Sequence, residues 1–257
     1  MAHRACFLLA LVAFSAPIAT AQQVTTTDAV EAVRNLEQYR EGLIKQWMND
    51  YGNLGRYRES NQKYPPPQPG ENRVVFMGDS ITDAWPMAKS FTGKPYINRG
   101  IGGQTTPQML IRFRPDVIDL DPKVVVILAG TNDIAGNTGP MTLAEIEGNL
   151  RTMSELAKLH GIQVVMSSVL PVNDYTERSK LFFPLRPPAQ ILELNGWIKD
   201  YCSKTGCIYL DYFSAMVDDK GLLKAELASD GLHPNEKGYA LMAPMAQKAI
   251  DQALSSH

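Results

Sequence analysis

Hydrophobic and polar positions along this chain follow two periods in turn, and these periods predict strands and helices. Short apolar runs rich in β-branched residues are typical of strands buried on both faces of a sheet. Apolar residues at three- and four-residue spacing are typical of amphipathic helices. The pattern predicts strands within residues 74–77, 95–100, 123–133, 162–170 and 207–213, and helices within residues 25–50, 107–120, 141–161, 189–206 and 235–254. Because strands and helices alternate, we expect a parallel sheet with helices on both faces.

The helix predicted at 141–161 has the clearest boundary signals. Thr142 and Glu145 have the spacing of a capping box, and Gly161 stands where a helix commonly ends. The helical spacing predicts that its buried side consists of Ile146, Leu150, Met153 and Ala157.

The first 21 residues have the pattern of a signal peptide. Arg4 supplies a positive charge, Cys6–Phe14 is an unbroken apolar run, and Ala19–Ala21 forms a small-x-small cleavage motif. We therefore expect cleavage before Gln22 and export to the periplasm or the extracellular medium. The alternative interpretation is a buried N-terminal helix. No cysteine stands at the cleavage point, so a bacterial lipid anchor is not expected.

The rest of the chain divides at a proline-rich stretch. Residues 22–72 are predicted to form a helical extension and a stiff connector, and residues 73–257 one domain with a full core. The formal net charge of −2 at pH 7 gives no indication of nucleic acid or an anionic membrane surface as a partner. No apolar run is long enough to predict a membrane span.

The strand predicted at 74–77 leads directly into Gly-Asp-Ser and then into helix-forming residues. Ser80 is therefore placed beyond the carboxyl end of a buried strand, where the functional sites of parallel sheets form. One interpretation is a tight strand-to-helix turn in which Ser80 caps the helix. The other is a nucleophilic serine, which needs a base to take its proton.

Histidine is the usual base for such a serine, and the chain has four histidines. His3 lies in the predicted signal peptide, His257 is the last residue, and His160 has an ordinary place at the end of a helix. The remaining histidine, His233, is the candidate base.

Asp230 precedes His233 by three residues, and Pro234 restricts the histidine to extended geometry at the start of the last predicted helix. Across a turn, this spacing lets the carboxylate reach one ring nitrogen while the other faces outward. A catalytic triad requires this orienting role. The competing interpretation is an Asx-capped turn beside a surface histidine.

Acyl transfer also needs donors for the negative charge that develops on the carbonyl oxygen. Asn98–Thr106 has three glycines in four residues, so its backbone can turn an N–H group toward a site. A phosphate-binding loop is a poorer interpretation, because the Walker lysine and the dinucleotide-binding spacing are missing. Asn132, beyond another buried run, offers either a side-chain donor or an ordinary Asx turn.

Taken together and in this order, these segments resemble the SGNH (GDSL) hydrolase superfamily, with a likeness to its platelet-activating-factor acetylhydrolase-like branch. "GDSIT" matches the first block and gives Ser80, "GIGGQTT" the second and gives Gly103, and "GTND" the third and gives Asn132. "DGLHP" matches the fifth block and gives Asp230 and His233. The resemblance runs from about residue 74 to the C-terminus.

The resemblance implies a flavodoxin-like, three-layer α/β/α fold with a central parallel sheet and a shallow, open site. It implies a serine esterase with a Ser80–His233–Asp230 triad and no cofactor or metal. The oxyanion hole would consist of the N–H groups of Ser80 and Gly103 and the Asn132 amide. An α/β-hydrolase nucleophile motif would need glycine where Thr82 stands.

The long loop at 169–189 is the candidate rim of the substrate pocket, and the alternative is a packed cover over the core. Export and the open fold favour short acyl groups, acetyl first, on carbohydrate. A lysophospholipase or arylesterase is the second interpretation. A glycan-binding domain without turnover and an acyltransferase are the others.

Two cysteines, Cys202 and Cys207, remain after the predicted cleavage. An even pair in an exported protein favours a structural disulfide over two free thiols. Gly206 lets the chain reverse between them, so we expect the bond to join a helix end to the start of the next strand.

Overall fold

The computed structural model describes residues 34, 38 and 41–255. The predicted signal peptide and most of the helix predicted at 25–50 lie outside the described residues, and residues 41–50 are helical. From Gln46 onward, the described residues belong to one compact unit. Within the described part of the chain, no helix is long and apolar enough to cross a membrane.

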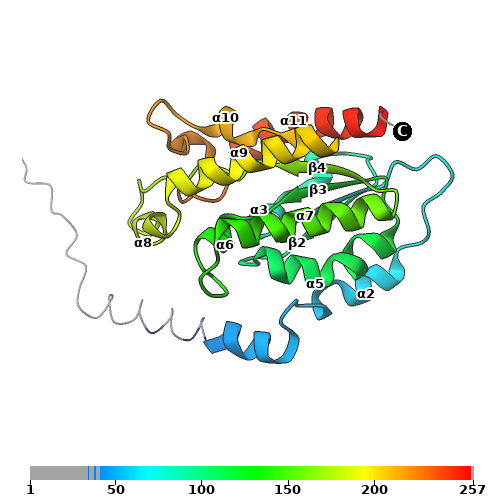
Figure 1. Ribbon diagram of the computed structural model, residues 1–257, viewed down its shortest axis with the longest axis horizontal. Helices are drawn as coiled ribbons and strands as arrows, with labels where there is room; N and C mark the ends of the chain where they lie inside the picture. Colours follow the sequence, from blue (N-terminus) through cyan, green and yellow to red (C-terminus); the bar gives the residue numbers. More distant parts are fainter. Residues whose placement is uncertain (1–33, 35–37, 39–40, 256–257) are drawn as a thin grey trace, which may run out of the picture. The chain divides into compact units, whose positions relative to one another are not determined.

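The five predicted strands and the helices predicted from residue 107 onward occur in the predicted order, with shorter helices between them that were not predicted (Figure 1). The strands are β1 (Val74–Gly78), β2 (Tyr96–Gly100), β3 (Val124–Leu128), β4 (Gln163–Ser167) and β5 (Ile208–Leu210). The helices are α2 (Gly55–Lys63), α3 (Ser80–Asp83), α4 (Met87–Ser90), α5 (Thr106–Asp116), α6 (Thr131–Ile134), α7 (Leu143–Leu159), α8 (Ser179–Phe182), α9 (Pro188–Thr205), α10 (Tyr212–Met216) and α11 (Glu236–Ser255). The 3-10 turns are η1 (Ile118–Leu120), η2 (Phe183–Leu185) and η3 (Ala225–Leu227).

All strands of the sheet are parallel, in the order β2-β1-β3-β4-β5. This order and the helices on both faces confirm the predicted α/β fold with a flavodoxin-like arrangement. β1 and β3 lie in the interior of the sheet and are buried at every position. Their continuous apolar runs thus reflect burial on both faces.

The two faces of the sheet bury separate apolar clusters. Alternate side chains of β1 and β3, such as Val75 and Ile127, pack with residues of α5, α7 and α9. The intervening side chains, such as Phe76 and Val126, pack with α11 and the segment around Trp85. Figure 1 shows α5 and α7 on one side of the strands and α11 on the other. Each strand is therefore held in place by both layers.

The predicted capping box of α7 is present, with Thr142 as the N-cap and reciprocal hydrogen bonds to Glu145. The predicted buried stripe is also confirmed, since Ile146, Leu150, Met153 and Ala157 are at most 1% exposed. Local sequence signals were sufficient for this helix.

Four predicted segments are shorter than expected or divided, and one of them, the strand predicted at 162–170, ends at Ser167. The run at 123–133 leaves the sheet after Leu128 and begins α6 at Thr131, because Gly130 turns the backbone at φ +122°. The helix predicted at 107–120 ends at Asp116 and continues as η1. The strand predicted at 207–213 ends at Leu210, after which Asp211 caps α10.

The residues that precede β1 pack against the sheet's crossover loop. Tyr57 of α2 donates its hydroxyl to the carbonyl of Gly100. The Gln104 amide nitrogen donates to the carbonyl of Gly52 at 2.9 Å. Residues 52–57, which precede the proline-rich connector, therefore hold the glycine-rich loop (residues 98–106) through these two hydrogen bonds.

Candidate active site

Ser80 is the first residue of α3, directly beyond the carboxyl end of β1. The strand and the helix approach so closely there that a β-carbon on Gly78 would run into the Thr82 side chain and lie 2.8 Å from the Leu128 carbonyl. Gly78 is thus required for the turn that presents Ser80, and Ser80 itself is partly exposed.

Asp79, and not Ser80, caps this helix. The Asp79 carboxylate accepts a hydrogen bond from the Ile81 N–H at 2.9 Å. The first of the two interpretations of Ser80 is therefore wrong in detail, and the serine hydroxyl is available for another partner.

That partner is His233. Ser80 Oγ lies 3.0 Å from His233 Nε2. The other ring nitrogen, Nδ1, lies 2.9 Å from Asp230 Oδ2 and 3.1 Å from Oδ1. The structure thus brings together the three side chains in the order that proton transfer from serine to histidine requires, with a carboxylate behind the ring.

Asp230 and His233 belong to one tight turn. The N–H groups of Leu232 and His233 both donate to Asp230 Oδ1, at 3.2 and 2.9 Å. Gly231 adopts φ +80°, and a β-carbon there would run into the Asn173 carbonyl. The hydrogen bonds within the turn and its close packing against Asn173 therefore fix the carboxylate relative to the ring.

Partial burial alone would raise the pKa of Asp230. The hydrogen bonds from the His233 N–H and ring, the charge of His233 and the Leu232 N–H outweigh it, so the net pKa is lowered. Asp230 is consequently an ionised acceptor at neutral pH, as an orienting carboxylate must be.

The glycine-rich loop lies next to Ser80. A β-carbon on Gly102 would stand 3.8 Å from Ser80 Cβ, and the next residue, Gly103, adopts φ +77°. The Gly103 carbonyl accepts a hydrogen bond from the exposed side chain of Asn137 at 3.0 Å. The loop that carries Gly103 is thus close enough to Ser80 to contribute a backbone donor.

Asn132 lies in the first turn of α6 and is 3% exposed. Its Nδ2 donates to the Gln104 carbonyl at 3.1 Å, which ties it to the same loop. Its Oδ1 accepts from Arg186 Nη2 at 3.2 Å. The side chain is therefore held at both ends, and one hydrogen of its amide group is committed to Gln104.

Asp79 and Asp133 are the two buried carboxylates beside these groups, and each is 1% exposed. Asp133 Oδ1 accepts from both the N–H and the hydroxyl of Thr106, at 2.8 and 2.5 Å. Burial raises the pKa of each to about 6, against the opposing effect of these hydrogen bonds and the Ile81 N–H. The second oxygen of each carboxylate is buried without a hydrogen-bond partner.

Arg112 is a buried residue of this region that sequence reasoning missed. Its guanidinium donates to the Gly78 carbonyl at 3.0 Å, the Gln104 side chain at 2.5 Å and the Asp116 carboxylate at 3.0 Å. Arg112 therefore links the strand before Ser80 to the loop that carries Gly103. One signal could have found it, since Arg112 and Asp116 share the apolar helical spacing of Met109 and Phe113.

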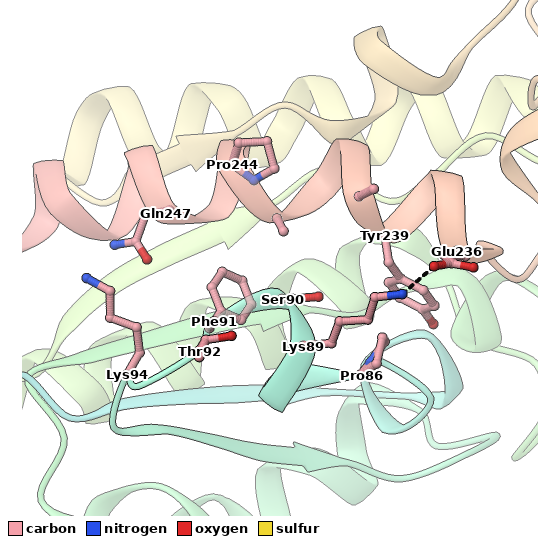
Figure 2. Close-up of a pocket in the computed structure, with 12 residues that line it drawn as sticks. Pro86, Lys89, Ser90, Phe91, Thr92, Lys94, Glu236, Tyr239, Pro244 and Gln247 are labelled. Carbon is pink, nitrogen blue, oxygen red and sulfur yellow. Dashed lines mark hydrogen bonds and ion pairs between the residues drawn. The ribbon is translucent and has the colours of Figure 1, made fainter.

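A separate groove of about 530 Å³ lies between the α4 segment and α11 (Figure 2). Phe91 and Tyr239 form part of its floor, and Lys89 is paired with Glu236 across one end. Its lining contains none of the side chains gathered around Ser80. The groove is therefore separate from the cluster of Ser80, His233 and Asp230.

Cys202 and Cys207 are joined by a disulfide in the structure, with their Cα atoms 4.5 Å apart. Cys202 lies in the last turn of α9, and Cys207 directly precedes β5. Gly206 between them adopts a left-handed conformation at φ +79°. The bond lies at the end of the sheet where β5 begins, opposite the carboxyl ends that carry Ser80.

The chain matches the model of the GDSL-like Lipase/Acylhydrolase family over residues 76–241. A solved structure from Bacteroides fragilis, described as a "putative acylhydrolase", is 41% identical, with 80% of this chain and 99% of that chain covered and a TM-score of 0.75. One from Streptococcus pneumonia, described as a "putative platelet activating factor", is 26% identical, with 86% and 99% covered and a TM-score of 0.70.

Two further similarities are more limited, one to a solved structure and one to part of a protein sequence. A catalytic mutant of an acetylxylan esterase from Geobacillus stearothermophilus is 21% identical, with 73% of this chain and 96% of that chain covered and a TM-score of 0.57, so it shares the fold alone. The uncharacterized lipoprotein YqeF of Bacillus subtilis is 34% identical over 103 residues, which are 39% of this chain and 42% of that protein. The chain therefore spans less than half of the length of this relative.

The family match covers more than half of the chain and includes the segments around Ser80, Gly103, Asn132 and His233. The fold and the related structures agree with it. The chain therefore belongs to the GDSL-like lipase/acylhydrolase family and is a carboxylic ester hydrolase.

Proposed function

We propose that this protein is an exported serine esterase that removes short acyl groups, acetyl first, from carbohydrate esters. One observation carries the proposal. Ser80 Oγ lies 3.0 Å from one ring nitrogen of His233, and the other ring nitrogen lies 2.9 Å from the Asp230 carboxylate. A serine with this support can become a nucleophile at neutral pH.

In the first step, Ser80 Oγ attacks the ester carbonyl carbon while His233 Nε2 takes the hydroxyl proton. The Asp230 carboxylate stabilises the resulting imidazolium through Nδ1. The tetrahedral intermediate then collapses, its bond to the alcohol oxygen breaks, and His233 gives its proton to that oxygen. The products are a free alcohol and an acyl-enzyme on Ser80.

In the second step, His233 takes a proton from water, and the hydroxide attacks the acyl carbonyl. The second tetrahedral intermediate expels Ser80 Oγ, which recovers its proton from His233. The carboxylic acid leaves, and the enzyme returns to its starting state without any cofactor in this scheme.

The negative oxygen of each intermediate needs donors that are fixed before the reaction. The proposed donors are the N–H groups of Ser80 and Gly103 and the second hydrogen of the Asn132 amide. The hydrogen bond from Asn132 to the Gln104 carbonyl supports this assignment, because it holds the amide beside the loop of Gly103.

The accessibility of the site supports a large alcohol group in the substrate. The side chains of His233 and Asp230 are 30% and 18% exposed, and Ser80 is partly exposed. A site of this kind limits the size of the alcohol little, which suits a carbohydrate. The fold shared with an acetylxylan esterase and the partial likeness to a lipoprotein are compatible with an acetyl ester and with export.

The test compares the wild-type protein, Ser80→Ala and the exposed control Ser203→Ala on p-nitrophenyl acetate, butyrate and octanoate and on acetylated xylan. We expect acetate to be the best of the three model esters. Ser80→Ala should lose at least ~10³ in kcat, and Ser203→Ala should match the wild type. Undiminished turnover by Ser80→Ala would remove the proposed nucleophile. A preference for octanoate would favour a lysophospholipase, and binding of xylan without turnover a glycan-binding role.

A further inference from the structure

Arg186 is a buried cation that the proposed triad and oxyanion hole do not use. It lies just before α9, at the end of the long loop that follows β4, and only 5% of it is exposed. Burial lowers its pKa, and the charges of Asp79 and Asp230 oppose that effect. A guanidinium is kept in such a place only where its donors have partners.

Two of these partners lie in the first turn of α6. Arg186 Nε donates to Thr131 Oγ1 and Nη2 donates to Asn132 Oδ1, both at 3.2 Å. The third, weaker contact runs from Nη1 to the Phe182 carbonyl at 3.3 Å. The planar fork thus joins the long loop to the residue that the oxyanion hole needs.

The chemistry of the contacts fixes which way the Asn132 amide points. A guanidinium can only donate, so the atom that faces Arg186 must be the oxygen. A carbonyl can only accept, so the atom that faces Gln104 must be the nitrogen. A flipped amide would place its NH₂ against the guanidinium and its oxygen against the Gln104 carbonyl. Both contacts would then become repulsive.

We propose that Arg186 is a positioning residue of the oxyanion hole, which locks the Asn132 amide with its NH₂ group toward the reacting carbonyl. The proposal rests on the proposed function, since it concerns the same intermediates. Arg186 acts through Asn132 and does not itself touch the substrate. The long loop therefore contributes to catalysis through one buried side chain.

A purely structural role is the rival explanation. Arg186 also lies over the Phe182 ring, with its Cζ 5.6 Å from the ring centroid, so it could simply hold the loop. In that case, its loss would lower stability and leave the chemical step intact. The two roles differ in whether the effect on kcat depends on the presence of Asn132.

The test is a double-mutant cycle of Arg186→Met and Asn132→Ala, with kcat and KM measured on p-nitrophenyl acetate. Arg186→Met alone should lower kcat about 10- to 100-fold with KM changed less than about twofold. In the Asn132→Ala background, the same substitution should change kcat less than about threefold. Arg178→Met, an exposed arginine of the same loop, should behave as the wild type.

Arg186→Lys keeps the cycle decisive if Arg186→Met fails to fold. Its ammonium retains the charge but cannot serve Thr131 and Asn132 as a planar fork, so kcat should fall only in the background with Asn132. Equal losses in both backgrounds, a loss confined to melting temperature, or a rise in KM alone would each overturn the proposal. A wild-type protein without esterase activity would overturn the proposed function itself.

Discussion

Asp230 and His233 of the proposed triad lie within one turn of the chain, whereas the proposed oxyanion side of the same centre is assembled from distant segments. The turn of Asp230 and His233 is closed by its own backbone N–H groups, and both side chains are partly exposed. The oxyanion side joins Gln104, Asn132 and Arg186, which are at most 5% exposed and far apart in sequence.

Because of this difference, we expect substitutions on the two sides to differ in how much they lower stability as well as activity. A change of Asp230 or His233, whose side chains are partly exposed, removes a proposed catalytic group and affects mainly hydrogen bonds within the turn. A change of Asn132 removes a proposed catalytic group and also leaves buried donors and acceptors without partners, which costs stability. Substitutions on the two sides can therefore be told apart by measuring both kcat and melting temperature for each variant.

The largest expected effect lies in the turn. Asp230→Asn should lower kcat by about 10³–10⁴, because a neutral amide no longer stabilises the imidazolium or the correct ring tautomer. The melting temperature should change less than it does in Asn132→Ala. Steady-state kinetics and thermal unfolding measure the two effects, and the exposed Asp219→Asn is the matched control. A large loss of stability with kcat retained would reverse the comparison.

The next effect lies on the oxyanion side. Asn132→Ala should lower kcat by about 10²–10³ with little change in KM, because its amide matters most when charge develops on the carbonyl oxygen. It should also cost about 1–3 kcal/mol of stability, because Arg186 and the Gln104 carbonyl lose a buried partner. Kinetics and urea unfolding test both parts. Raised KM with normal kcat would instead make Asn132 a substrate contact.

The buried carboxylates give the oxyanion side a pH dependence of stability. Burial raises the pKa of Asp79 and Asp133 to about 6, above the value of about 3.9 in an unfolded chain. Between these values the folded state holds protons that the unfolded state has released. The protonated carboxyl groups therefore make their full contribution to the free energy of unfolding below about pH 4, and this contribution is lost as the pH rises toward 6.

Asp133→Asn removes one of the two titrating carboxyl groups and with it that group's contribution to the pH dependence of stability. Relative to the wild type, its free energy of unfolding should rise by up to about 3 kcal/mol between pH 4 and pH 7, whatever its absolute stability. Urea unfolding at both pH values measures the difference, and the exposed Asp200→Asn is the control. A wild-type-like pH dependence in Asp133→Asn would show that this carboxyl group titrates normally.

The same contrast decides what could be predicted from the sequence. The alternation of apolar runs and helical spacing predicted the fold class, since β1 and β3 are buried on both faces and carry no polar interruption. "DGLHP" identified Asp230 and His233, because their contact is made within a few residues of chain. "GTND" identified Asn132 through resemblance, although its position on a short helix was missed.

The partners of the oxyanion side could not be predicted. Arg186 lies 54 residues from Asn132 in sequence, and no local pattern links the two. Arg112 stands in an otherwise apolar helix stripe, a signal of a buried charge that does not say which carbonyl it serves. Long-range polar contacts depend on the packing of whole elements, so the sequence suggested the proposed donors but not the residues that hold them in place.

The disulfide lies on neither side of the centre and should have the smallest effect. The Cys202–Cys207 bond closes a loop with a sequence separation of only 5, so it restricts the unfolded chain little. Replacing both residues, in Cys202→Ala/Cys207→Ala, should cost about 2 kcal/mol and lower the melting temperature by about 4–8 °C. The bond lies at the opposite end of the sheet from Ser80, so kcat should stay within about twofold of the wild type.

Calorimetry and steady-state kinetics measure both, and alkylation of the unfolded, unreduced wild type is the check on the bond. Two modified thiols would mean that the protein has no such bond, and a large loss of kcat in the double variant would mean that this end of the sheet influences the proposed active site.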